Sequence, residues 1–490
     1  MTLPKQTSQR LSALISRYLV DCGIFFVGFA VAVFFRFHGF GEMKRMLPSI
    51  LSGVLVFGAC AYIVGIYSTR PVVEKRGRVI AKLLLAVAAG MLAILAVSYI
   101  NYSGRIGRGV MMMAIAMITI GIYIHRFWTD MVFEHRAEQT LFVIWKESDL
   151  DLLGFFRSLP IGAMNQVSIV TNLKNSGFED MPNLGKIDDL SAICRDNEIS
   201  RVVGSEDFLQ SEVNHPKWRR VRYEGVEVSS MVNYCEEFFQ FTPVNLITPN
   251  WLIGACVTPQ AFYIRKAKRL TDLLAAAVLG VVLIPILLVA IIAVKLTSKG
   301  PAFFVQQRVG RFGKHFKLYK LRSMMTDAEV SGAVWTASGD DPRQTSIGRW
   351  LRKFRIDEIP QLWNVWKGEM SLVGPRPERP EFTGKLANEI PFYDERHFVA
   401  PGLTGWAQVS YPYGASVQDS QHKLEYDLFY IKHMNQFFDF TILVETVRIV
   451  LTGGLSRANA SSDRPWLQAS MSYSKLASKE TNAVPELVLF

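Results

Sequence analysis

Long apolar runs with almost no charge dominate the first 130 residues of this 490-residue chain. Each run approaches the roughly 17–25 residues that a helix needs to cross about 30 Å of hydrocarbon. Only Asp21 interrupts the first run, and the next two carry no formal charge at all. The runs are Tyr18–Phe35, Met46–Tyr67, Leu83–Ile100 and Gly109–Ile124. A purely soluble protein and a disordered one are therefore excluded, and we predict a four-helix transmembrane region over residues 1–137.

Lysine and arginine in the flanks of these runs predict their orientation, because cytoplasmic loops carry the excess of positive charge. The N-terminal flank and the loop after the second run are the more basic, with Lys5, Arg10, Arg17, Arg70, Lys75, Arg76, Arg78 and Lys82. The opposite loops have fewer, namely Arg36, Lys44, Arg45, Arg105 and Arg108. We expect both ends of the bundle in the cytoplasm. The first run is too long for a signal peptide and lacks a small-x-small cleavage site, so we expect it to be retained.

Residues 138–260 have the pattern of a soluble α/β unit. Short apolar runs alternate there with polar, helix-compatible stretches, which is typical of βαβ units. The runs are Leu141–Trp145, Val167–Val170, Arg201–Val203 and Val226–Val228. A dinucleotide-binding unit would have G-x-G-x-x-G after its first strand, but the sequence there is KESDLDLLG, without the glycine turn and with added negative charge. We predict a degenerate Rossmann-like domain that binds no nucleotide, and this domain is a candidate surface for forming a homodimer.

The net charge of +11 favours an anionic partner such as acidic lipid, a phosphorylated substrate or nucleic acid. Nucleic acid is the least favoured, because the basic residues adjoin an apolar run and lipid phosphate is nearer. The five cysteines lie far apart and form no CxxC pair, so neither a disulfide framework nor a zinc site is indicated. A reducing cytosolic compartment fits them best.

A fifth apolar run, Leu273–Val294, has 22 uncharged residues with Pro285 near its middle. One interpretation is a fifth spanning helix that is kinked at the proline. Two observations favour a re-entrant helix over residues 270–296 instead. Basic residues flank the run on both sides, without the bias of a spanning helix, and Pro285 removes a hydrogen bond where a hairpin needs to bend. Each arm of about a dozen residues would be about 18 Å long, enough to enter one leaflet and return.

The segment Arg265–Met325 holds twelve Lys or Arg residues and only one acidic residue, Asp272. Part of this charge is expected to contact anionic lipid headgroups, at about 1 kcal/mol per residue. Within it, the string QQRVGRFGKHFKLYKLRSM interleaves glycines with basic residues. Glycines allow backbone N–H groups to approach a phosphate, and basic side chains supply charge. The candidate phosphate ligands there are Arg308, Arg311, Lys314, Lys317, Lys320 and Arg322.

A second string, RIDEIPQLWNVWKGEMSLVGPRPERPEF, contains the adjacent carboxylates Asp357 and Glu358. Neighbours on a helix point about 100° apart, so these two side chains can share a metal ion only near a helix terminus. The alternative is an ordinary surface pair at the start of a helix. In the same string, Arg376 lies between two prolines that fix the backbone on both sides of its guanidinium, although the same residues also suit a simple rigid loop.

These strings carry a family resemblance. From about Arg269 to Gly453 the chain resembles the bacterial sugar transferases of the polyisoprenyl-phosphate hexose-1-phosphate transferase family, the monotopic phosphoglycosyl transferases. The matching strings are KGPAFFVQQRVGRFGKHFKLYKLRSM, DPRQTSIGRWLRKFRIDEIPQLWNVWKGEMSLVGPRPERPEF and RHFVAPGLTGWAQVSYPYG. They are long, in order and closely spaced. LYKLRSM has leucine where many relatives have phenylalanine before the arginine, an apolar exchange. The N-terminal helices and the Rossmann-like middle match the layout of the larger members.

The resemblance implies an enzyme that acts in two steps. Asp357 would attack the β-phosphate of a UDP-sugar and expel UMP, and polyprenyl (undecaprenyl) phosphate would then take the sugar phosphate, giving polyprenyl diphosphate-sugar. It implies Mg²⁺ at Asp357 and Glu358, because a diphosphate and a carboxylate repel each other. The implied substrate contacts are Lys320, Arg322, Arg352 and Arg376, with Arg308 and Arg311 from the glycine-rich string and Asp427 as a second acidic site. Asp341, Arg343 and Thr345 fit a structural or donor-side role better.

These features predict a membrane protein with four parts. They are an α-helical N-terminal bundle (1–137), a Rossmann-like α/β middle domain (138–260), a mostly α, membrane-associated catalytic domain with a re-entrant helix (261–453) and a flexible tail (454–490). We expect it in the bacterial inner membrane, with the catalytic domain on the cytoplasmic face, initiating exopolysaccharide or similar glycan assembly with glucose or galactose as the default sugar. The alternative is a non-catalytic membrane scaffold that recruits polysaccharide-assembly partners.

Overall fold

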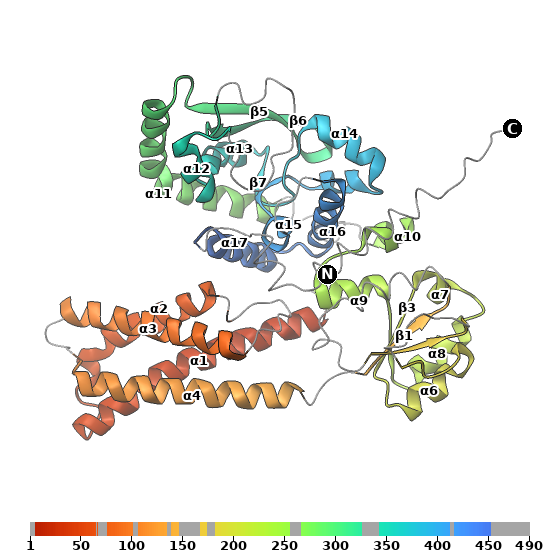
Figure 1. Ribbon diagram of the computed structural model, residues 1–490, viewed down its shortest axis with the longest axis horizontal. Coiled ribbons are helices and arrows are strands. Elements are labelled where there is room, and N and C mark those ends of the chain that lie inside the picture. The colour runs from red at the N-terminus through yellow and green to blue at the C-terminus, as the bar shows by residue number, and fades with distance from the viewer. Residues whose placement is uncertain are drawn as a thin grey trace.

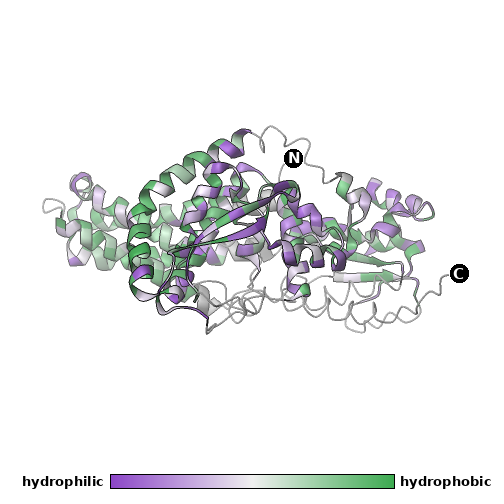
Figure 2. Ribbon diagram, turned by 90° about the horizontal axis from the view of Figure 1, so that it is seen from above, coloured by the Kyte–Doolittle hydropathy of each residue, from purple (hydrophilic) through white to green (hydrophobic). Residues whose placement is uncertain are grey.

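The computed structural model arranges the chain in three bodies. Figure 1 shows a helical bundle below, a sheet with its helices to the right, and a larger, mostly helical body above. In Figure 2, where the molecule is seen from above, much of its left half is hydrophobic. The described residues are 5–64, 66, 76–100, 106–134, 139–146, 167–173, 182–254, 266–325, 343–411 and 416–451. Asp341 and the expected tail lie outside them.

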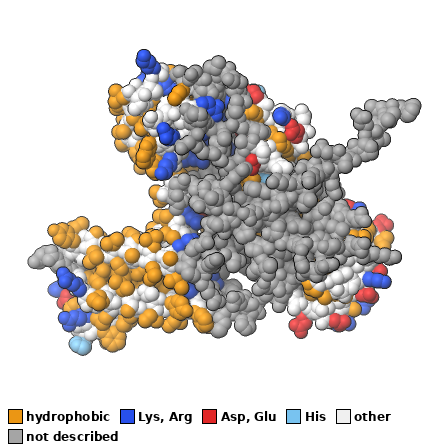
Figure 3. Space-filling model, in the orientation of Figure 1, with side chains coloured by type: hydrophobic (Ala, Val, Ile, Leu, Met, Phe, Trp, Pro, Cys, Tyr) orange, Lys and Arg blue, Asp and Glu red, His pale blue; other side chains and the backbone are white. Residues whose placement is uncertain are grey.

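Four long helices form the bundle, and the four apolar runs are confirmed as helices, the second of them as far as Ile63. They are α1 Lys5–Phe37, α2 Met43–Ile63, α3 Arg76–Ile100 and α4 Arg108–Glu134. Each contains a segment long and apolar enough to cross a membrane, and only 28–39% of each apolar window is buried inside the protein. Hydrophobic side chains cover the visible face of the bundle in Figure 3. Such an outward apolar surface is what lipid requires, so the chain is a membrane protein.

Glycines and one buried charge pack the bundle. α2 and α3 approach closely at Gly53 and Gly90, where a Cβ added to Gly90 would lie 2.9 Å from Gly53 O. Asp21, fully buried on α1, reaches α4, where its carboxylate lies 2.7 Å from both His125 Nδ1 and Arg126 Nη2. The one acidic residue of the first apolar run therefore pairs with basic groups inside the bundle, as a charge at membrane depth must.

The second body is built on a parallel sheet. Its strands are β1 Thr140–Ile144, β2 Val167–Thr171, β3 Arg201–Gly204 and β4 Glu227–Ser230, in the order β2-β1-β3-β4. Its helices are η3 Ile187–Asp189, α6 Leu190–Asp196, α7 Glu206–Gln210, α8 His215–Tyr223 and α9 Met231–Phe239. All four predicted strands are confirmed. Leu141 and Val143 of β1 pack toward α6 and α8, whereas Phe142 and Ile144 pack toward α9, which is the two-sided burial of a parallel sheet.

The upper body is mostly helical. Its helices are η4 Val244–Leu246, α10 Pro249–Gly254, α11 Lys268–Thr297, η7 Arg311–Gly313, α12 Ser346–Lys353, η8 Ile356–Gln361, α13 Leu362–Lys367, α14 Pro380–Glu389, η9 Tyr393–Phe398, α15 Trp406–Ser410, α16 Val417–His433 and α17 Gln436–Leu451. β5 Phe303–Val309 and β6 His315–Leu321 form an antiparallel pair. β7 Ser371–Val373 and β8 Gly402–Thr404 form a parallel pair.

α11 contains the fifth apolar run, and only 11% of its apolar window is buried. A straight helix of its 30 residues would be about 45 Å long, but Figure 1 shows two arms that meet at a bend. At its start, Lys268 Nζ lies 2.7 Å from Asp439 Oδ2 of α17. Near its end, Val294 packs in one cluster with Leu321 and Leu351. Both ends of α11 therefore rest on the same body.

The sheet body and the upper body share one hydrophobic core. This core joins Phe142 of β1 with Trp406 of α15 and Phe429 of α16. Trp406 Nε1 also donates to the backbone oxygen of Gln240, just after α9, at 2.8 Å. The segment before the predicted boundary of the C-terminal domain therefore already packs into the upper body.

Candidate active site

The adjacent carboxylates lie on η8, directly after a sharp turn that ends α12. Arg355 makes this turn with a φ of 56°, a left-handed conformation that residues other than glycine adopt rarely. Asp357 and Glu358 are only 6% and 7% exposed. An ordinary surface pair at a helix start, the alternative that the sequence left open, is therefore excluded.

Three basic side chains converge on one oxygen of Glu358. Its Oε1 lies 2.9 Å from Arg376 Nη2, 3.2 Å from Arg355 Nη1 and 3.5 Å from Lys320 Nζ. Burial alone would raise the pKa of this carboxyl, but the three cations, Arg376 foremost, hold the pKa well below its usual range. Glu358 is therefore ionised and gathers basic groups from β6, from the turn before η8 and from the loop after β7.

Asp357 has the opposite environment, although it is the next residue along the chain. Its Oδ1 is buried and has no hydrogen-bond partner among the described residues. Burial and the charge of Glu358 raise the pKa of Asp357 to about 6, against the opposing effects of Lys320, Arg352 and Arg355. Two carboxyl groups with pKa values pushed apart are typical of sites in which each group has a separate chemical task.

The basic residues around the dyad come from separate elements. Lys320 lies on β6, and burial lowers its pKa to about 8, although Glu358 opposes this shift. Arg352 lies in the last turn of α12, near enough to Asp357 to lower the pKa of its carboxyl. The structure thus brings together at the dyad three of the predicted phosphate contacts, Lys320, Arg352 and Arg376.

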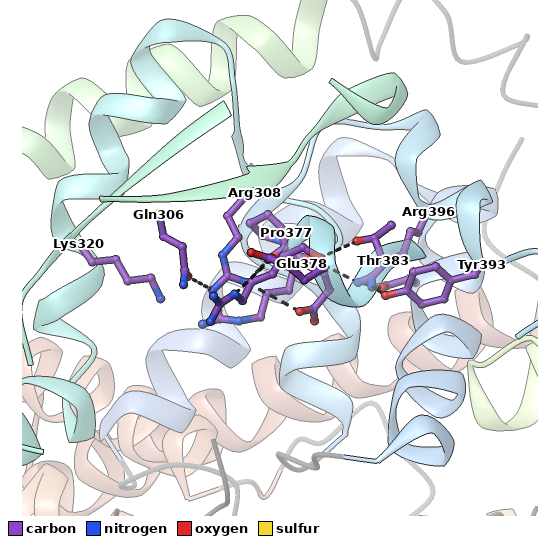
Figure 4. A network of polar contacts seen from close by, with 12 residues as sticks. Gln306, Arg308, Lys320, Pro377, Glu378, Thr383, Tyr393 and Arg396 are labelled. Atoms are coloured by element: carbon purple, nitrogen blue, oxygen red, sulfur yellow. Dashed lines mark hydrogen bonds and ion pairs between the residues drawn. The ribbon is translucent and has the colours of Figure 1, made fainter. Parts of the chain in front are cut away.

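A second layer of arginines holds the backbone of the loop that carries Arg376. Arg396 Nη2 donates to the backbone oxygen of Arg376 at 3.1 Å and to Asp427 Oδ2 at 2.8 Å. Arg308 Nη1 donates to the oxygen of Pro377 at 3.1 Å. Figure 4 shows Arg308 beside this turn, with Lys320 pointing toward the same region. The loop is therefore anchored through its main chain, which leaves the Arg376 side chain directed at Glu358.

Three predicted contacts lie elsewhere in the described part of the chain. Asp427 on α16 is 1% exposed and binds Arg396 rather than the dyad, and burial raises the pKa of its carboxyl to about 6. Arg311 donates from Nε to Phe398 O at 3.3 Å. Arg322 donates to Ser298 at the end of α11.

Two residues of this region received no role from the sequence. Arg355 acts through a positive φ that its residue type does not signal. Arg396 is 5% exposed, and a buried arginine requires a partner such as Asp427.

Thr345 has a structural role, because its side-chain oxygen accepts a hydrogen bond from Gly348 N at 3.0 Å and caps the N-terminus of α12.

The donor set of the dyad fits a magnesium ion. Among the described residues, no group of three or more His, Cys, Asp and Glu side chains is placed to hold a metal. Magnesium, however, is commonly held by one or two carboxylates together with substrate phosphates. The buried Oδ1 of Asp357 is an acceptor without a partner among the described residues, which is the kind of atom that such an ion would satisfy.

Comparison with known proteins places this site in a family. The family described as bacterial sugar transferase matches residues 263–453, which include the dyad and all its basic neighbours. A UDP-N-acetylgalactosamine-undecaprenyl-phosphate N-acetylgalactosaminephosphotransferase of Aeromonas hydrophila is 45% identical over 186 residues, which are 38% of this chain and 44% of that protein.

Two further relatives are named UDP-glucose:undecaprenyl-phosphate glucose-1-phosphate transferase. The one from Xanthomonas campestris pv. campestris is 31% identical over 283 residues, 56% of this chain and 57% of that protein. The one from Caulobacter vibrioides is 41% identical over 187 residues, 38% of this chain and 70% of that protein. The match thus covers less than two thirds of the Aeromonas and Xanthomonas proteins but more than two thirds of the Caulobacter one. The chain belongs to the bacterial sugar transferase family.

Proposed function

We propose that the chain transfers a sugar 1-phosphate from a UDP-sugar to polyprenyl phosphate and releases UMP. The observation that carries this proposal is the asymmetry of the dyad. Asp357 has a buried oxygen without a hydrogen-bond partner among the described residues, beside Glu358, whose charge is met by three cations. The names of the relatives, which give UDP-sugars and undecaprenyl phosphate, support the same reaction and the start of a glycan as its purpose.

The reaction has two displacement steps at one phosphorus atom. In the first, a carboxylate oxygen of Asp357 forms a bond to the β-phosphorus of the UDP-sugar, the bond from that phosphorus to the bridging oxygen breaks, and UMP leaves with the oxygen. In the second, an oxygen of polyprenyl phosphate attacks the same phosphorus, and Asp357 returns as a carboxylate. The two steps allow one site to serve a soluble donor and a lipid acceptor in turn.

The cations around Glu358 are suited to the charge that this reaction brings. Arg376, Lys320 and Arg355 already converge on one carboxylate oxygen before any substrate is present. Because they are held in place, phosphoryl oxygens that enter beside Glu358 meet positive charge without a costly rearrangement. Asp357 and Glu358 would hold Mg²⁺ together with the donor diphosphate, and the bound ion would supply further neutralisation of the phosphates.

We further propose that α11 enters the membrane and returns on the same side. At its start, Arg269 donates to the oxygens of Val365 at 2.6 Å and Trp366 at 2.7 Å. At its end, Arg322 donates to Ser298 O at 2.9 Å. A helix that crossed would separate its two ends by about 30 Å of hydrocarbon, whereas these contacts tie both ends to one body.

Exposed aromatic residues beside α11 support a position at the membrane surface. Trp350 on α12 is 60% exposed, Phe354, the C-terminal capping residue of α12, is 40% exposed, and Trp363 on α13 is 55% exposed. Lys353 Nζ lies 5.7 Å from the ring centroids of both Trp350 and Phe354. Aromatic rings and lysines with apolar stems are enriched where hydrocarbon meets water. η8, which lies between these two helices, would then hold the dyad near the lipid headgroups.

The contact between the upper body and the bundle supports a proposal about the side of the membrane on which the site lies. Arg448 Nε donates to the oxygen of Ile63, the last residue of α2, at 3.0 Å. The end of α2 leads into the most basic loop of the bundle, which the distribution of Lys and Arg assigns to the cytoplasm. We therefore propose that the site faces the cytoplasm at the bacterial inner membrane, where UDP-sugars are available.

The test is UMP release in membranes supplied with Mg²⁺, polyprenyl phosphate and a panel of UDP-sugars. We expect wild type to release UMP with at least one sugar and Asp357→Asn to release none. Lys385→Gln is a control, since that side chain is 65% exposed on α14. With donor but no acceptor, mass spectrometry should find a phosphosugar on Asp357. Retained release by Asp357→Asn would contradict the proposal, and absence of release from wild type would favour the scaffold alternative.

A further inference from the structure

Arg322 occupies an unusual position for a basic residue of a phosphate-binding string. It directly follows β6 and is 6% exposed. Its Nη2 donates to the backbone oxygen of Ser298 at 2.9 Å and to the hydroxyl oxygen of Ser298 at 2.8 Å. Ser298 is the C-terminal capping residue of α11, and its own hydroxyl donates to Val294 O at 3.0 Å. The guanidinium of Arg322 therefore hydrogen-bonds to the residue that caps the C-terminus of α11.

The charge of Arg322 is balanced by this helix end rather than by a carboxylate. Among the described residues no acidic side chain pairs with it, and its buried Nε and Nη1 have no hydrogen-bond partner there. The C-terminal end of a helix carries a partial negative charge, which a cation in contact with it stabilises. A buried guanidinium that has only this compensation is costly, so the contact with Ser298 is what stabilises Arg322 at this place.

The end of α11 lies directly against the helix of the dyad. Val294, which is fully buried, shares a hydrophobic cluster with Leu321 of β6, Leu351 of α12 and Ile356, the first residue of η8. Ile356 immediately precedes Asp357. A shift of the C-terminal arm of α11 would therefore move the backbone that carries the attacking carboxylate.

We propose that Arg322 is a positioning residue, which clamps the C-terminal arm of α11 to β6 so that η8 holds Asp357 in line with the donor phosphorus. This proposal rests on the proposed function, and it differs from the role of phosphate contact that the family resemblance implies for Arg322. A phosphate contact stabilises bound donor and acts on its affinity. A clamp leaves the donor site formed and acts on the rate of attack, in both half-reactions, because both occur at the same aspartate.

The first experiment compares Arg322→Gln and Arg322→Lys with the exposed control Lys385→Gln in full-length protein. For Arg322→Gln we expect kcat to fall about 10- to 100-fold in each half-reaction, with the KM for UDP-sugar nearly unchanged. Arg322→Lys should recover part of kcat, since an ammonium can still donate to Ser298 O. An increase in KM with unchanged kcat would overturn the clamp and favour a phosphate contact. Loss of the donor half-reaction from wild type would instead contradict the proposed function itself.

The second experiment is a double-mutant cycle with Ser298→Ala, which removes one acceptor of Arg322 and is a milder change if Arg322→Gln fails to fold. Residues that act through one contact are not additive. We expect Ser298→Ala to lower kcat less than Arg322→Gln does, and the double variant to be no slower than Arg322→Gln alone. Effects on kcat that multiply in the double variant would show that Arg322 and Ser298 act independently, and would overturn the clamp.

Discussion

Arg376 Nη2 lies 2.9 Å from Glu358 Oε1, although the two residues are 18 positions apart in the sequence. This contact brings the loop after β7 onto η8, and Lys320 adds β6 at the same oxygen. One carboxylate thus organises cations from several elements, while its neighbour Asp357 remains without a hydrogen-bond partner at Oδ1 among the described residues. Removing the charge of Glu358 should therefore affect both the cations and the carboxyl group of Asp357.

Glu358→Gln keeps the size of the side chain and removes this charge. Because the charge of Glu358 raises the pKa of Asp357, we expect the acid limb of UMP release to move to lower pH in the variant. We also expect the rate at neutral pH to fall about 100-fold, since the cations lose their common anchor. Initial rates across the pH range measure both effects. Glu381→Gln, a change at a 59% exposed carboxylate, is the matched control, and an acid limb that does not move would contradict the interpretation.

The proposed transfer by the wild-type protein should proceed only in a window of pH. In the proposed reaction Asp357 must be ionised to attack, and burial raises its pKa to about 6, so activity should be lost as the pH falls through this value. Lys320 must be protonated to stabilise phosphate, and burial lowers its pKa to about 8, so activity should be lost again as the pH rises through that value. The acid limb reports the Asp357–Glu358 pair as a unit. Lys320→Arg should extend the alkaline limb upward, because a guanidinium stays charged. An unchanged alkaline limb would remove Lys320 from this role.

The sequence predicted the elements that hydropathy alone determines. The apolar runs Tyr18–Phe35 and Leu83–Ile100 lie within α1 and α3, because length and lack of charge suffice to identify a membrane helix. The four strands of the middle domain also lie where short apolar runs occur. The dyad was identified by its resemblance to a family, and its burial then excluded the surface alternative.

The partners of each basic residue could not be predicted in the same way. Lys320 and Arg322 are two residues apart and seemed equivalent in the sequence, yet the structure directs Lys320 to Glu358 and Arg322 to Ser298. These contacts depend on how β6 packs between η8 and α11, which spacing along the chain does not encode. The sequence also does not reveal the left-handed turn at Arg355. A glycine at this position would have indicated such a turn, but an arginine does not.

The buried pair of Arg396 and Asp427 offers a test that separates stability from catalysis. Asp427→Asn leaves Arg396 buried without its carboxylate, and we expect it to destabilise the protein by about 3–5 kcal/mol in thermal or denaturant unfolding. The double variant Arg396→Met with Asp427→Leu should regain much of this stability, because apolar side chains need no partner. The affinity of this double variant for UDP-sugar should stay below that of wild type. The reason is that the backbone oxygen of Arg376 no longer receives the hydrogen bond from Arg396. Full recovery of KM in the double variant would show that Arg396 does not position Arg376.

Removal of divalent metal should abolish both half-reactions. The buried Oδ1 of Asp357, which has no hydrogen-bond partner in the part of the chain that the structure describes, and the carboxylate of Glu358 suit an ion that also binds the donor diphosphate. We expect excess EDTA to stop UMP release and added Mg²⁺ to restore it fully. Thermal unfolding of the protein without donor should change little on chelation, because the ion needs substrate phosphates as ligands. Undiminished turnover in EDTA would contradict the metal role of the dyad.

The course of α11 can be tested with single cysteines in a variant whose native cysteines are replaced by serine and which retains UMP release. Lys299→Cys reports the exposed stretch just after α11. Gly41→Cys reports the turn between α1 and α2, where an added Cβ meets nothing within 4 Å, and Tyr223→Cys reports the 79% exposed end of α8. In right-side-out vesicles, an impermeant thiol reagent should label only Gly41→Cys, because a re-entrant α11 returns Lys299 to the cytoplasmic side with α8. After permeabilisation all three should react. Labelling of Lys299→Cys together with Gly41→Cys in sealed vesicles would show that α11 spans the membrane. In that case the dyad could not share a compartment with α8, although the core that joins α9 to α15 and α16 requires it to do so.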